Sequence, residues 1–346
     1  QLNLFSTLTD FLAAPEPVHY KDRIFVICGY AGTGKTSVVR ALVKTLPSTS
    51  LRTVLLAPTG RAAKVMAAYS GQQAFTIHKR IYFTDTSEGG LEFSLQENKF
   101  KNTLFIVDEA SMIGSEYGND LLGDLINYVS SGHRCRLVLI GDDAQLPPVG
   151  KSESPALDQN NLESNWHLKV HQARLTEVMR QEEGSGILFN ATQIREMINQ
   201  NRTDNPQFKI TNDVIRLQGN DLEDVLNEAL TKFGDDEVLV VTRSNRSANK
   251  YNREIRSRIR WQENDISAGD RLMVVKNNYF WLPEGSGLGF IANGDIAEVL
   301  RLGKSYQYGK FRFADAEIRL SDYEEASSLP VRLLLNTLDS DQAGMP

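Results

Sequence analysis

The octapeptide Gly29–Thr36 (GYAGTGKT) constrains this chain more than any other feature, because it fits the pattern G-x-x-x-x-G-K-[ST] in full. The apolar run Arg23–Gly29 precedes it and predicts a buried strand, and the helical pattern Thr36–Leu46 follows. In such a strand–loop–helix unit, backbone N–H groups curl around phosphate oxygens and the helix N-terminus adds a favourable dipole. A glycine-rich turn that matches by chance is the alternative, and the flanking strand and helix argue against it.

Each residue type in this loop has a chemical role. Lys35 is expected to neutralise the β- and γ-phosphates, and Thr36 is expected to hold Mg²⁺. The sequence therefore predicts a site for ATP and Mg²⁺. The expected nucleotide contacts are Gly29, Gly32, Thr33, Gly34, Lys35 and Thr36.

Two adjacent carboxylates, Asp108 and Glu109, end the apolar run Thr103–Asp108 (TLFIVD). At the tip of a parallel strand they would lie at the ligand-bearing edge of the sheet. Asp108 is expected to hold Mg²⁺, directly or through water, and Glu109 to polarise the attacking water. A solvated helix cap is the alternative interpretation of this pair. With the phosphate loop, the pair predicts a nucleoside triphosphatase.

Short Val/Ile/Leu runs alternate with helical stretches through the first half of the chain. Thr53–Ala57 and Arg136–Gly141 predict two further buried strands, and Ala62–Tyr69 predicts a helix. Continuous apolar runs separated by helices indicate an α/β fold with a parallel sheet covered on both faces. Ile81–Lys101 interrupts this rhythm with a Ser-Glu-Gly-Gly turn signal and predicts an inserted hairpin.

The second half of the chain is less regular. Ser152–Asn165 is polar and predicts a loop, whereas Gly186–Asn199 predicts a helix. Glu237–Thr242 (EVLVVT) predicts another buried strand, and a basic helix, Ser247–Arg260, is expected after it. The alternating pattern of Gly269–Leu320 predicts a small β-barrel.

Composition and charge limit the classes of function. A chain of 346 residues suggests two or three domains. The net charge of -6 argues against a protein that binds nucleic acid through overall positive charge, but not against one with a basic groove. The two cysteines form no CxxC pair, so a reduced, cytoplasmic setting is expected. No apolar run is long enough to span a membrane, and no signal peptide is visible.

Five segments resemble, in order, motifs Ia, Ib, II, III and IV of superfamily 1 DNA helicases of the RecD-like and Dda-like branch. They are APTGRAAK (Ala57–Lys64), TIH (Thr76–His78), DEAS (Asp108–Ser111), GDDAQLPPVG (Gly141–Gly150) and LTEVMRQ (Leu175–Gln181). The first residues, Gln1–Phe5, resemble the end of the adenine-reading Q motif, with Gln1 as the candidate contact. The resemblance covers roughly residues 1–300 and implies P-loop, RecA-like motor domains.

This resemblance implies further catalytic roles. Gln145, just beyond a strand end, is expected to sense the γ-phosphate or the water. Arg180 is implied as an arginine finger across a cleft, with a surface salt bridge as the alternative. The implied catalytic residues are Lys35, Glu109, Gln145 and Arg180.

The resemblance also implies a surface that touches DNA phosphates without selecting sequence. The hairpin falls where the family carries a strand-separating pin. Phe93 near its tip is expected either to stack on the fork base pair or to anchor the hairpin. A packing role is an equal alternative for His78. The implied nucleic-acid contacts are Pro58, Thr59, Gly60, Arg61, Lys64, Thr76, His78, Phe93, Thr242, Arg243 and Asn245.

The implied organisation is a first RecA-like motor domain at 1–175, carrying the pin at 81–101, and a partial second RecA-like domain at 176–265. A β-barrel insertion is expected at 266–325, and the start of the remaining second motor domain at 326–346. Two later family motifs, of the HKxQG and YVALTR types, do not occur. The second motor domain is therefore expected to be incomplete.

The leading hypothesis is an ATP-dependent DNA helicase that translocates on single-stranded DNA and acts at forks, with 5′→3′ polarity implied by the family alone. An RNA helicase of the same superfamily is one alternative, which contacts to the 2′-hydroxyl would distinguish. A non-translocating, ATP-dependent nucleic-acid-binding module is another. A small-molecule kinase is disfavoured, because the motif III and IV segments have no role there. The sequence does not reveal which proteins are its partners.

Overall fold

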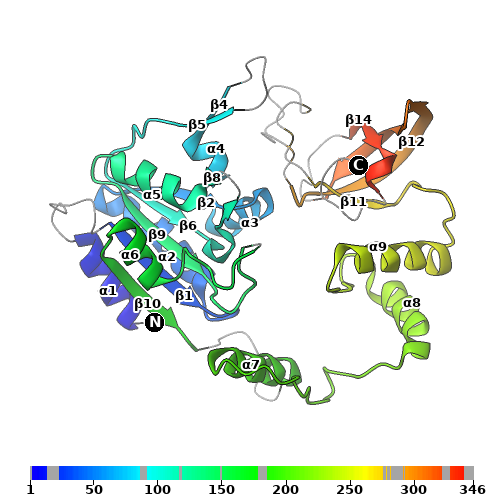
Figure 1. Ribbon diagram of the computed structural model, residues 1–346, viewed down its shortest axis with the longest axis horizontal. Coiled ribbons are helices and arrows are strands. Elements are labelled where there is room, and N and C mark those ends of the chain that lie inside the picture. Colours follow the sequence, from blue (N-terminus) through cyan, green and yellow to red (C-terminus); the bar gives the residue numbers. More distant parts are fainter. Residues whose placement is uncertain are drawn as a thin grey trace. The chain divides into compact units, whose positions relative to one another are not determined.

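The computed structural model describes residues 2–13, 23–85, 92–116, 119–148, 150–177, 185–275, 278, 281, 291, 293–321 and 328–338. The chain forms two compact units, Gln1–Val214 and Ile215–Pro346 (Figure 1). Helix α7 (Gly186–Asn199) belongs to the first unit. The Arg195 guanidinium of α7 lies 3.6 Å from the centre of the Tyr30 ring in the phosphate loop.

A six-stranded sheet forms the centre of the first unit, in the order β10-β1-β9-β6-β2-β3. Every neighbouring pair is parallel, which confirms the predicted α/β fold. β1, β6 and β9 are buried along their whole length, as strands covered on both faces must be. The strands are β1 (Ile24–Gly29), β2 (Arg52–Ala57), β3 (Ala74–Thr76), β6 (Thr103–Val107), β9 (Arg136–Gly141) and β10 (Val170–Leu175).

Two separate hydrophobic cores cover the two faces of this sheet. Phe25 and Ile27 of β1 pack with α1, α2 and α3, whereas Val26 and Cys28 pack with α4, α5 and α6. Side chains alternate along a strand, so one continuous apolar run supplies both cores. The helices are α1 (Leu2–Ala13), α2 (Lys35–Thr45), α3 (Gly60–Ser70), α4 (Ile77–Ile81), α5 (Leu121–Ser131) and α6 (Gln159–Trp166), with short 3₁₀ turns η2 (Leu46–Thr49) and η3 (Ala110–Met112).

The predicted inserted hairpin is present. β4 (Tyr82–Asp85) pairs antiparallel with β5 (Glu92–Leu95), and residues 86–91 between them lie outside the described residues. A second, two-residue antiparallel pair joins β7 (Ser115–Glu116) to β8 (Asn119–Asp120).

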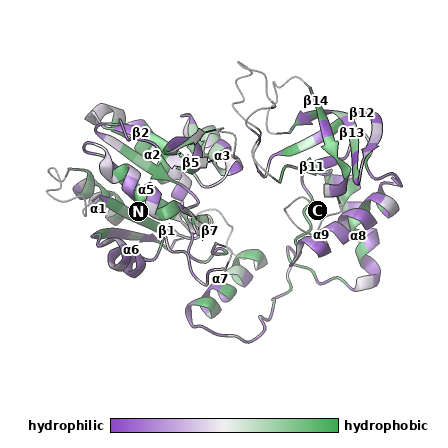
Figure 2. Ribbon diagram, turned by 45° about the horizontal axis from the view of Figure 1, so that its top comes forward, coloured by the Kyte–Doolittle hydropathy of each residue, from purple (hydrophilic) through white to green (hydrophobic). Residues whose placement is uncertain are grey.

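The prediction of a loop at Ser152–Asn165 is wrong for the second half of this segment, where α6 forms. The Asp158 carboxylate accepts a hydrogen bond from the Asn160 N–H and caps this helix. Leu162 is fully buried in the core, and this contact outweighs the polar composition of the segment. Figure 2 shows the polar composition of α6 beside the hydrophobic residues concentrated in the sheet.

The second unit contains helices and an antiparallel sheet in the order β11-β12-β13-β14. β-structure in this region was predicted and is present. A small β-barrel was predicted here, and among the described residues the sheet is open, with β11 and β14 at its edges. The elements are η4 (Gly219–Asp221), α8 (Leu222–Phe233), α9 (Asn245–Glu254), the π-turn η5 (Ile255–Ile259), β11 (Arg271–Met273), β12 (Ile296–Tyr308), β13 (Phe311–Leu320), β14 (Leu329–Leu334) and η6 (Leu335–Thr337).

The buried strand predicted at Glu237–Thr242 is wrong. Leu239 and Val241 are 85% and 84% exposed, and the segment is irregular. A buried parallel strand needs neighbours that satisfy its backbone groups on both sides. No described strand of the second unit pairs with this segment, so its apolar composition alone does not make it a strand.

None of the described helices is both long and apolar enough to cross a membrane.

Candidate active site

The phosphate loop connects β1 to α2, as predicted. Gly32 and Gly34 have φ values of 78° and 94°, in the left-handed region that favours glycine. A Cβ atom on Gly29 would lie 2.8 Å from the Thr33 Oγ1 atom, so the loop closes tightly only with glycine there. The backbone therefore has the tight, open-faced turn that phosphate binding requires.

Lys35 is the first residue of α2, and its ammonium reaches back across the loop. Its Nζ atom donates hydrogen bonds to the carbonyl oxygens of Gly29, at 2.6 Å, and Tyr30, at 3.0 Å. Thr33 is buried, and its hydroxyl donates to the Tyr30 carbonyl at 2.7 Å. Thr33 thus stabilises the loop itself, while Lys35 places a positive charge at its mouth. Thr36 follows on α2 and is half-buried.

Asp108 and Glu109 directly follow β6. The Asp108 Oδ2 atom accepts a hydrogen bond from the Tyr69 hydroxyl at 2.6 Å, and its Oδ1 atom accepts one from the Glu109 N–H at 2.9 Å. Glu109 has a φ of 54°, a left-handed conformation that costs a residue other than glycine on the order of 1–3 kcal/mol. Strain of this kind concentrates at functional sites.

Burial raises the pKa of the Glu109 carboxyl, and the negative charge of Asp108 raises it further. The positive charge of Lys35 acts in the opposite direction on the pKa of Glu109. The Lys35 ammonium and the Glu109 carboxylate therefore interact electrostatically within one site. A carboxylate with a raised pKa is suited to accept a proton from water.

Gln145 belongs to the turn after β9, and its side chain is exposed. Its Oε1 atom accepts a hydrogen bond from the Ser111 hydroxyl at 3.3 Å, so the motif II and motif III segments are in contact. Asp142 is buried and organises this turn by accepting from the Ala144 N–H at 2.9 Å. Because β1, β9 and β6 are adjacent, the segments that follow them meet at the carboxyl edge of the sheet.

Two of the predicted nucleotide-site residues, Gln1 and Arg180, lie outside the described residues. Their roles stay predictions.

The predicted nucleic-acid contacts are distributed over several elements. On α3, Arg61 is exposed and Lys64 is half-buried, and Pro58 and Gly60 lie at the start of this helix. The Thr59 Oγ1 atom accepts from the Ala62 N–H at 3.2 Å and caps α3.

Thr76 has a similar role one strand further along the chain. It is buried, and its Oγ1 atom accepts from the Lys79 N–H at 3.2 Å, which caps α4. The His78 ring lies 5.6 Å from the Tyr82 ring, consistent with the packing alternative.

The remaining contacts lie on the hairpin and in the second unit. The backbone of Phe93 pairs with Thr84 in β4. Thr242, Arg243 and Asn245 lie at the start of α9, where Ser244 is the helix cap.

The sequence did not point to Tyr69, because it lies in no recognised motif.

A row of aromatic side chains on the β12–β13 hairpin was also missed. Tyr306 lies opposite Phe313, and Tyr308 lies opposite Phe311, so all four share one face. Tyr308 is 80% exposed. The alternation in KSYQYGKFRF, four aromatic and three basic residues without an acid, is the signal that would have identified this face.

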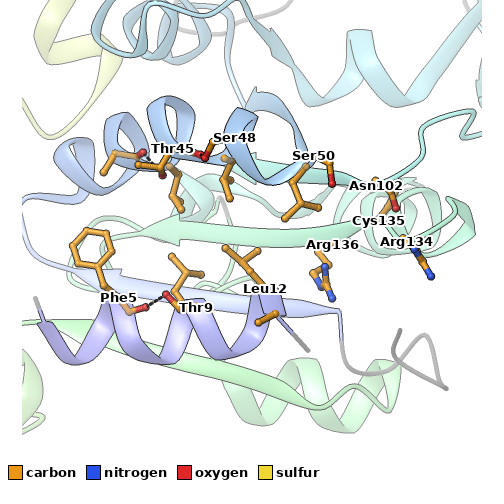
Figure 3. Close-up of a pocket in the computed structure, with 16 residues that line it drawn as sticks. Phe5, Thr9, Leu12, Thr45, Ser48, Ser50, Asn102, Arg134, Cys135 and Arg136 are labelled. Atoms are coloured by element: carbon orange, nitrogen blue, oxygen red, sulfur yellow. Dashed lines mark hydrogen bonds between the residues drawn. The ribbon is translucent and has the colours of Figure 1, made fainter. Parts of the chain in front are cut away.

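A cavity of about 720 Å³ lies elsewhere in the first unit, between α1 and the end of α2 (Figure 3). Thr9 and Leu12 of α1 line it, and Arg136 and Arg134 lie toward the end away from Phe5. Arg136 begins β9, so the cavity is at the amino edge of the sheet, whereas the phosphate loop is at the carboxyl edge. The cavity is therefore not part of the nucleotide site.

A parallel sheet with a phosphate loop after β1 and a carboxylate pair after the nearby strand β6 defines a P-loop nucleotide-binding protein. Residues 13–218 match the AAA domain family. The chain belongs to this family, and it is similar to RecD2 and Dda DNA helicases, as its motifs implied.

Three relatives illustrate this similarity. The ATP-dependent RecD2 DNA helicase of Deinococcus radiodurans is 35% identical over 127 residues, which is 37% of this chain and 16% of that protein. The ATP-dependent DNA helicase dda of Enterobacteria phage T4 is 32% identical over 173 residues, 49% of this chain and 37% of the helicase. Uncharacterized protein R530 of Acanthamoeba polyphaga mimivirus is 27% identical over 299 residues, 76% of this chain and 58% of the relative. The chain thus spans less than two thirds of each relative.

Proposed function

We propose that this chain hydrolyses ATP with Mg²⁺ and forms the motor core of a DNA helicase that translocates on single-stranded DNA. The observation that carries this proposal is the convergence of Lys35, Asp108, Glu109 and Gln145 at the carboxyl ends of adjacent strands. Membership of the AAA domain family and the similarity to two proteins named DNA helicases support it.

The residues present fit a magnesium nucleotide. The glycine loop leaves backbone N–H groups to receive phosphates, and Lys35 neutralises the β/γ charge. Thr36 and Asp108 would hold Mg²⁺ through their hydroxyl and carboxylate oxygens, and the ion would neutralise phosphate charge when bound. We further assign adenine contact to Gln1.

Hydrolysis then needs an activated water. Glu109, with its raised pKa, accepts a proton from the water, while Gln145 orients the water or senses the γ-phosphate. Arg180 is the proposed arginine finger that stabilises charge on the transferring phosphoryl group.

Nucleic acid would contact both units. In the first unit, the start of α3, with Pro58, Thr59, Gly60, Arg61 and Lys64, offers backbone, hydroxyl and cationic groups to phosphates. Thr76 and His78 are less favoured, because Thr76 is buried and the His78 ring packs on Tyr82.

The second unit contributes Thr242, Arg243 and Asn245 and the aromatic face of the β12–β13 hairpin, since exposed rings interleaved with cations suit single strands. The 5′→3′ polarity and the preference for forks rest on the family resemblance alone. Two buried, unpaired cysteines, Cys28 and Cys135, support a reducing, cytoplasmic setting.

Replacing Lys35 tests the phosphate site. Lys35→Ala removes the loop's ammonium, so ATP hydrolysis should fall to background while circular dichroism shows an intact fold. Lys44→Ala, an exposed lysine at the other end of α2, is the matched control and should hydrolyse ATP normally. Turnover at the wild-type rate in Lys35→Ala would refute the phosphate-site assignment.

Strand displacement tests the motor. Partial duplexes with a 5′ or a 3′ single-stranded tail, made of DNA or RNA, are incubated with ATP, and release of the labelled strand is measured. Release from the 5′-tailed DNA substrate alone supports the proposal. DNA-stimulated hydrolysis without release of any strand would instead indicate a non-translocating binding module, and preferential release from RNA would indicate an RNA helicase.

A further inference from the structure

Tyr69 connects helix α3 to the carboxylate expected to hold magnesium. Its hydroxyl donates a 2.6 Å hydrogen bond to the Oδ2 atom of Asp108, 39 residues further along the chain. The Tyr69 ring is half-buried and packs against the core that α1, α2 and α3 share with the sheet. Core packing therefore restricts the ring and aims the hydroxyl at the carboxylate.

The remaining contacts of Asp108 come from the backbone. Its Oδ1 atom accepts from the Glu109 N–H at 2.9 Å, and its own N–H donates to the Leu56 carbonyl at 3.0 Å. Among the described residues, the hydrogen bond from Tyr69 is the one that a side chain donates to this carboxylate. A carboxylate offers about four lone-pair positions, so two donors leave room for a metal ion or its water.

We propose that Tyr69 is a positioning residue that fixes the orientation of Asp108 toward Mg²⁺. This inference rests on the proposed function, because it concerns the same metal nucleotide. Partners beyond the ligands themselves orient metal-binding side chains and strengthen metal affinity. Without the hydroxyl, the carboxylate can rotate about its terminal bond, and ordering it around the ion costs more free energy.

The location of Tyr69 gives this contact a second consequence. Tyr69 shares helix α3 with Arg61 and Lys64, the proposed phosphate contacts for nucleic acid. One helix therefore carries both a candidate DNA contact and a hydrogen bond to the magnesium carboxylate. A shift of α3 on DNA binding would move the hydroxyl relative to Asp108.

The test uses Tyr69→Phe, which keeps the ring and removes only the hydroxyl. Mn²⁺ binding in the presence of ADP is measured by electron paramagnetic resonance, which needs no hydrolysis. The Mn²⁺ dissociation constant should rise roughly 10-fold, as is typical when a partner of a metal ligand is lost. Affinity for ADP without metal should stay unchanged, because Tyr69 contacts the carboxylate and not the phosphate loop.

Tyr82→Phe is the matched control. Its hydroxyl donates to the Asp124 Oδ2 atom at 2.6 Å, the same phenol–carboxylate contact in the same unit but away from the phosphate loop. This variant should bind Mn²⁺ with ADP as the wild type does. Equal weakening in both variants would show a general loss of structure and overturn the inference.

Two further measurements separate positioning from a merely structural role. The Mg²⁺ concentration for half-maximal ATP hydrolysis should rise by the same factor in Tyr69→Phe, with little change in kcat at saturating Mg²⁺. In an Asp108→Asn background, Tyr69→Phe should add no further weakening of Mn²⁺ binding, because the two residues act through one contact. Additive effects would overturn the inference.

The outcome also distinguishes this inference from the proposed function. If the wild type binds Mn²⁺ with ADP but never displaces a strand, the helicase proposal fails and the role of Tyr69 stands. If the wild type hydrolyses ATP and Tyr69→Phe keeps the wild-type Mn²⁺ affinity, only the inference fails. A wild type that binds no Mn²⁺ with ADP contradicts both.

Discussion

At the scale of single residues, Glu109 is held at a cost to stability. Its backbone is left-handed, its carboxyl is partly buried, and it lies beside the negative charge of Asp108. None of these features stabilises the fold, and each suits a group that must take a proton from water. Active-site residues often lower stability in this way.

Glu109→Gln should therefore raise stability and abolish activity. The pKa of Glu109 is raised in the folded protein, so the folded chain holds the proton more tightly than the unfolded chain. Stability is lost as the pH rises above the ordinary value of 4.5, where the unfolded chain ionises first. Glutamine does not ionise, so the variant does not lose this stability. Its kcat should fall at least roughly 100-fold, because the group that accepts the proton from water is gone.

Thermal unfolding across the pH range checks this expectation. The gain in Tm of Glu109→Gln over the wild type should grow as the pH rises above 4.5 and vanish at lower pH. Glu153→Gln, at an exposed site, should show no such trend. A Tm of Glu109→Gln below that of the wild type at neutral pH would argue against this account.

At the scale of elements, the β4–β5 hairpin is the piece proposed to separate strands. Phe93→Ala should reduce strand displacement several-fold more than ATP hydrolysis, because the β4–β5 hairpin contains none of the residues proposed to bind or hydrolyse ATP. Phe83→Ala, in the partner strand β4, is the matched control, since Phe83 is 60% exposed. Equal loss of displacement and hydrolysis in Phe93→Ala would remove the pin role.

At the scale of the whole molecule, the described site lies within one unit. Lys35, Tyr69, Asp108, Glu109 and Gln145 all belong to residues 1–214, together with both hydrophobic cores of the parallel sheet. The fragment 1–214 should therefore fold alone and bind ADP with Mg²⁺ within about threefold of the affinity of the whole chain, a difference of less than 1 kcal/mol.

Titration with a fluorescent ADP analogue measures this affinity, and circular dichroism checks the fold. The fragment should lose stimulation of hydrolysis by single-stranded DNA, because it lacks Arg243, Asn245 and the β12–β13 hairpin. A fragment that folds but does not bind nucleotide would show that the second unit completes the site.

Local patterns predicted the first unit well because its strands are continuous apolar runs and its loop needs particular residues. The ranges expected for β9 and α7 match those observed. The wrong predictions fall where tertiary contacts determine the secondary structure of a segment. Burial of Leu162 in the core stabilises a helix in a segment whose composition is polar. Leu239 and Val241 are exposed, because no described strand pairs with their segment.

The sequence by itself determined the phosphate loop, because left-handed glycines and a lysine at a helix start are local requirements. It also determined the carboxylate pair, since a buried strand that ends in Asp108 and Glu109 must present them at the sheet edge. Only the tertiary structure decided which strands are neighbours, and therefore that these segments meet. It alone revealed the hydrogen bond from Tyr69 to Asp108, because a contact between a helix and a strand end depends on packing that no local pattern encodes.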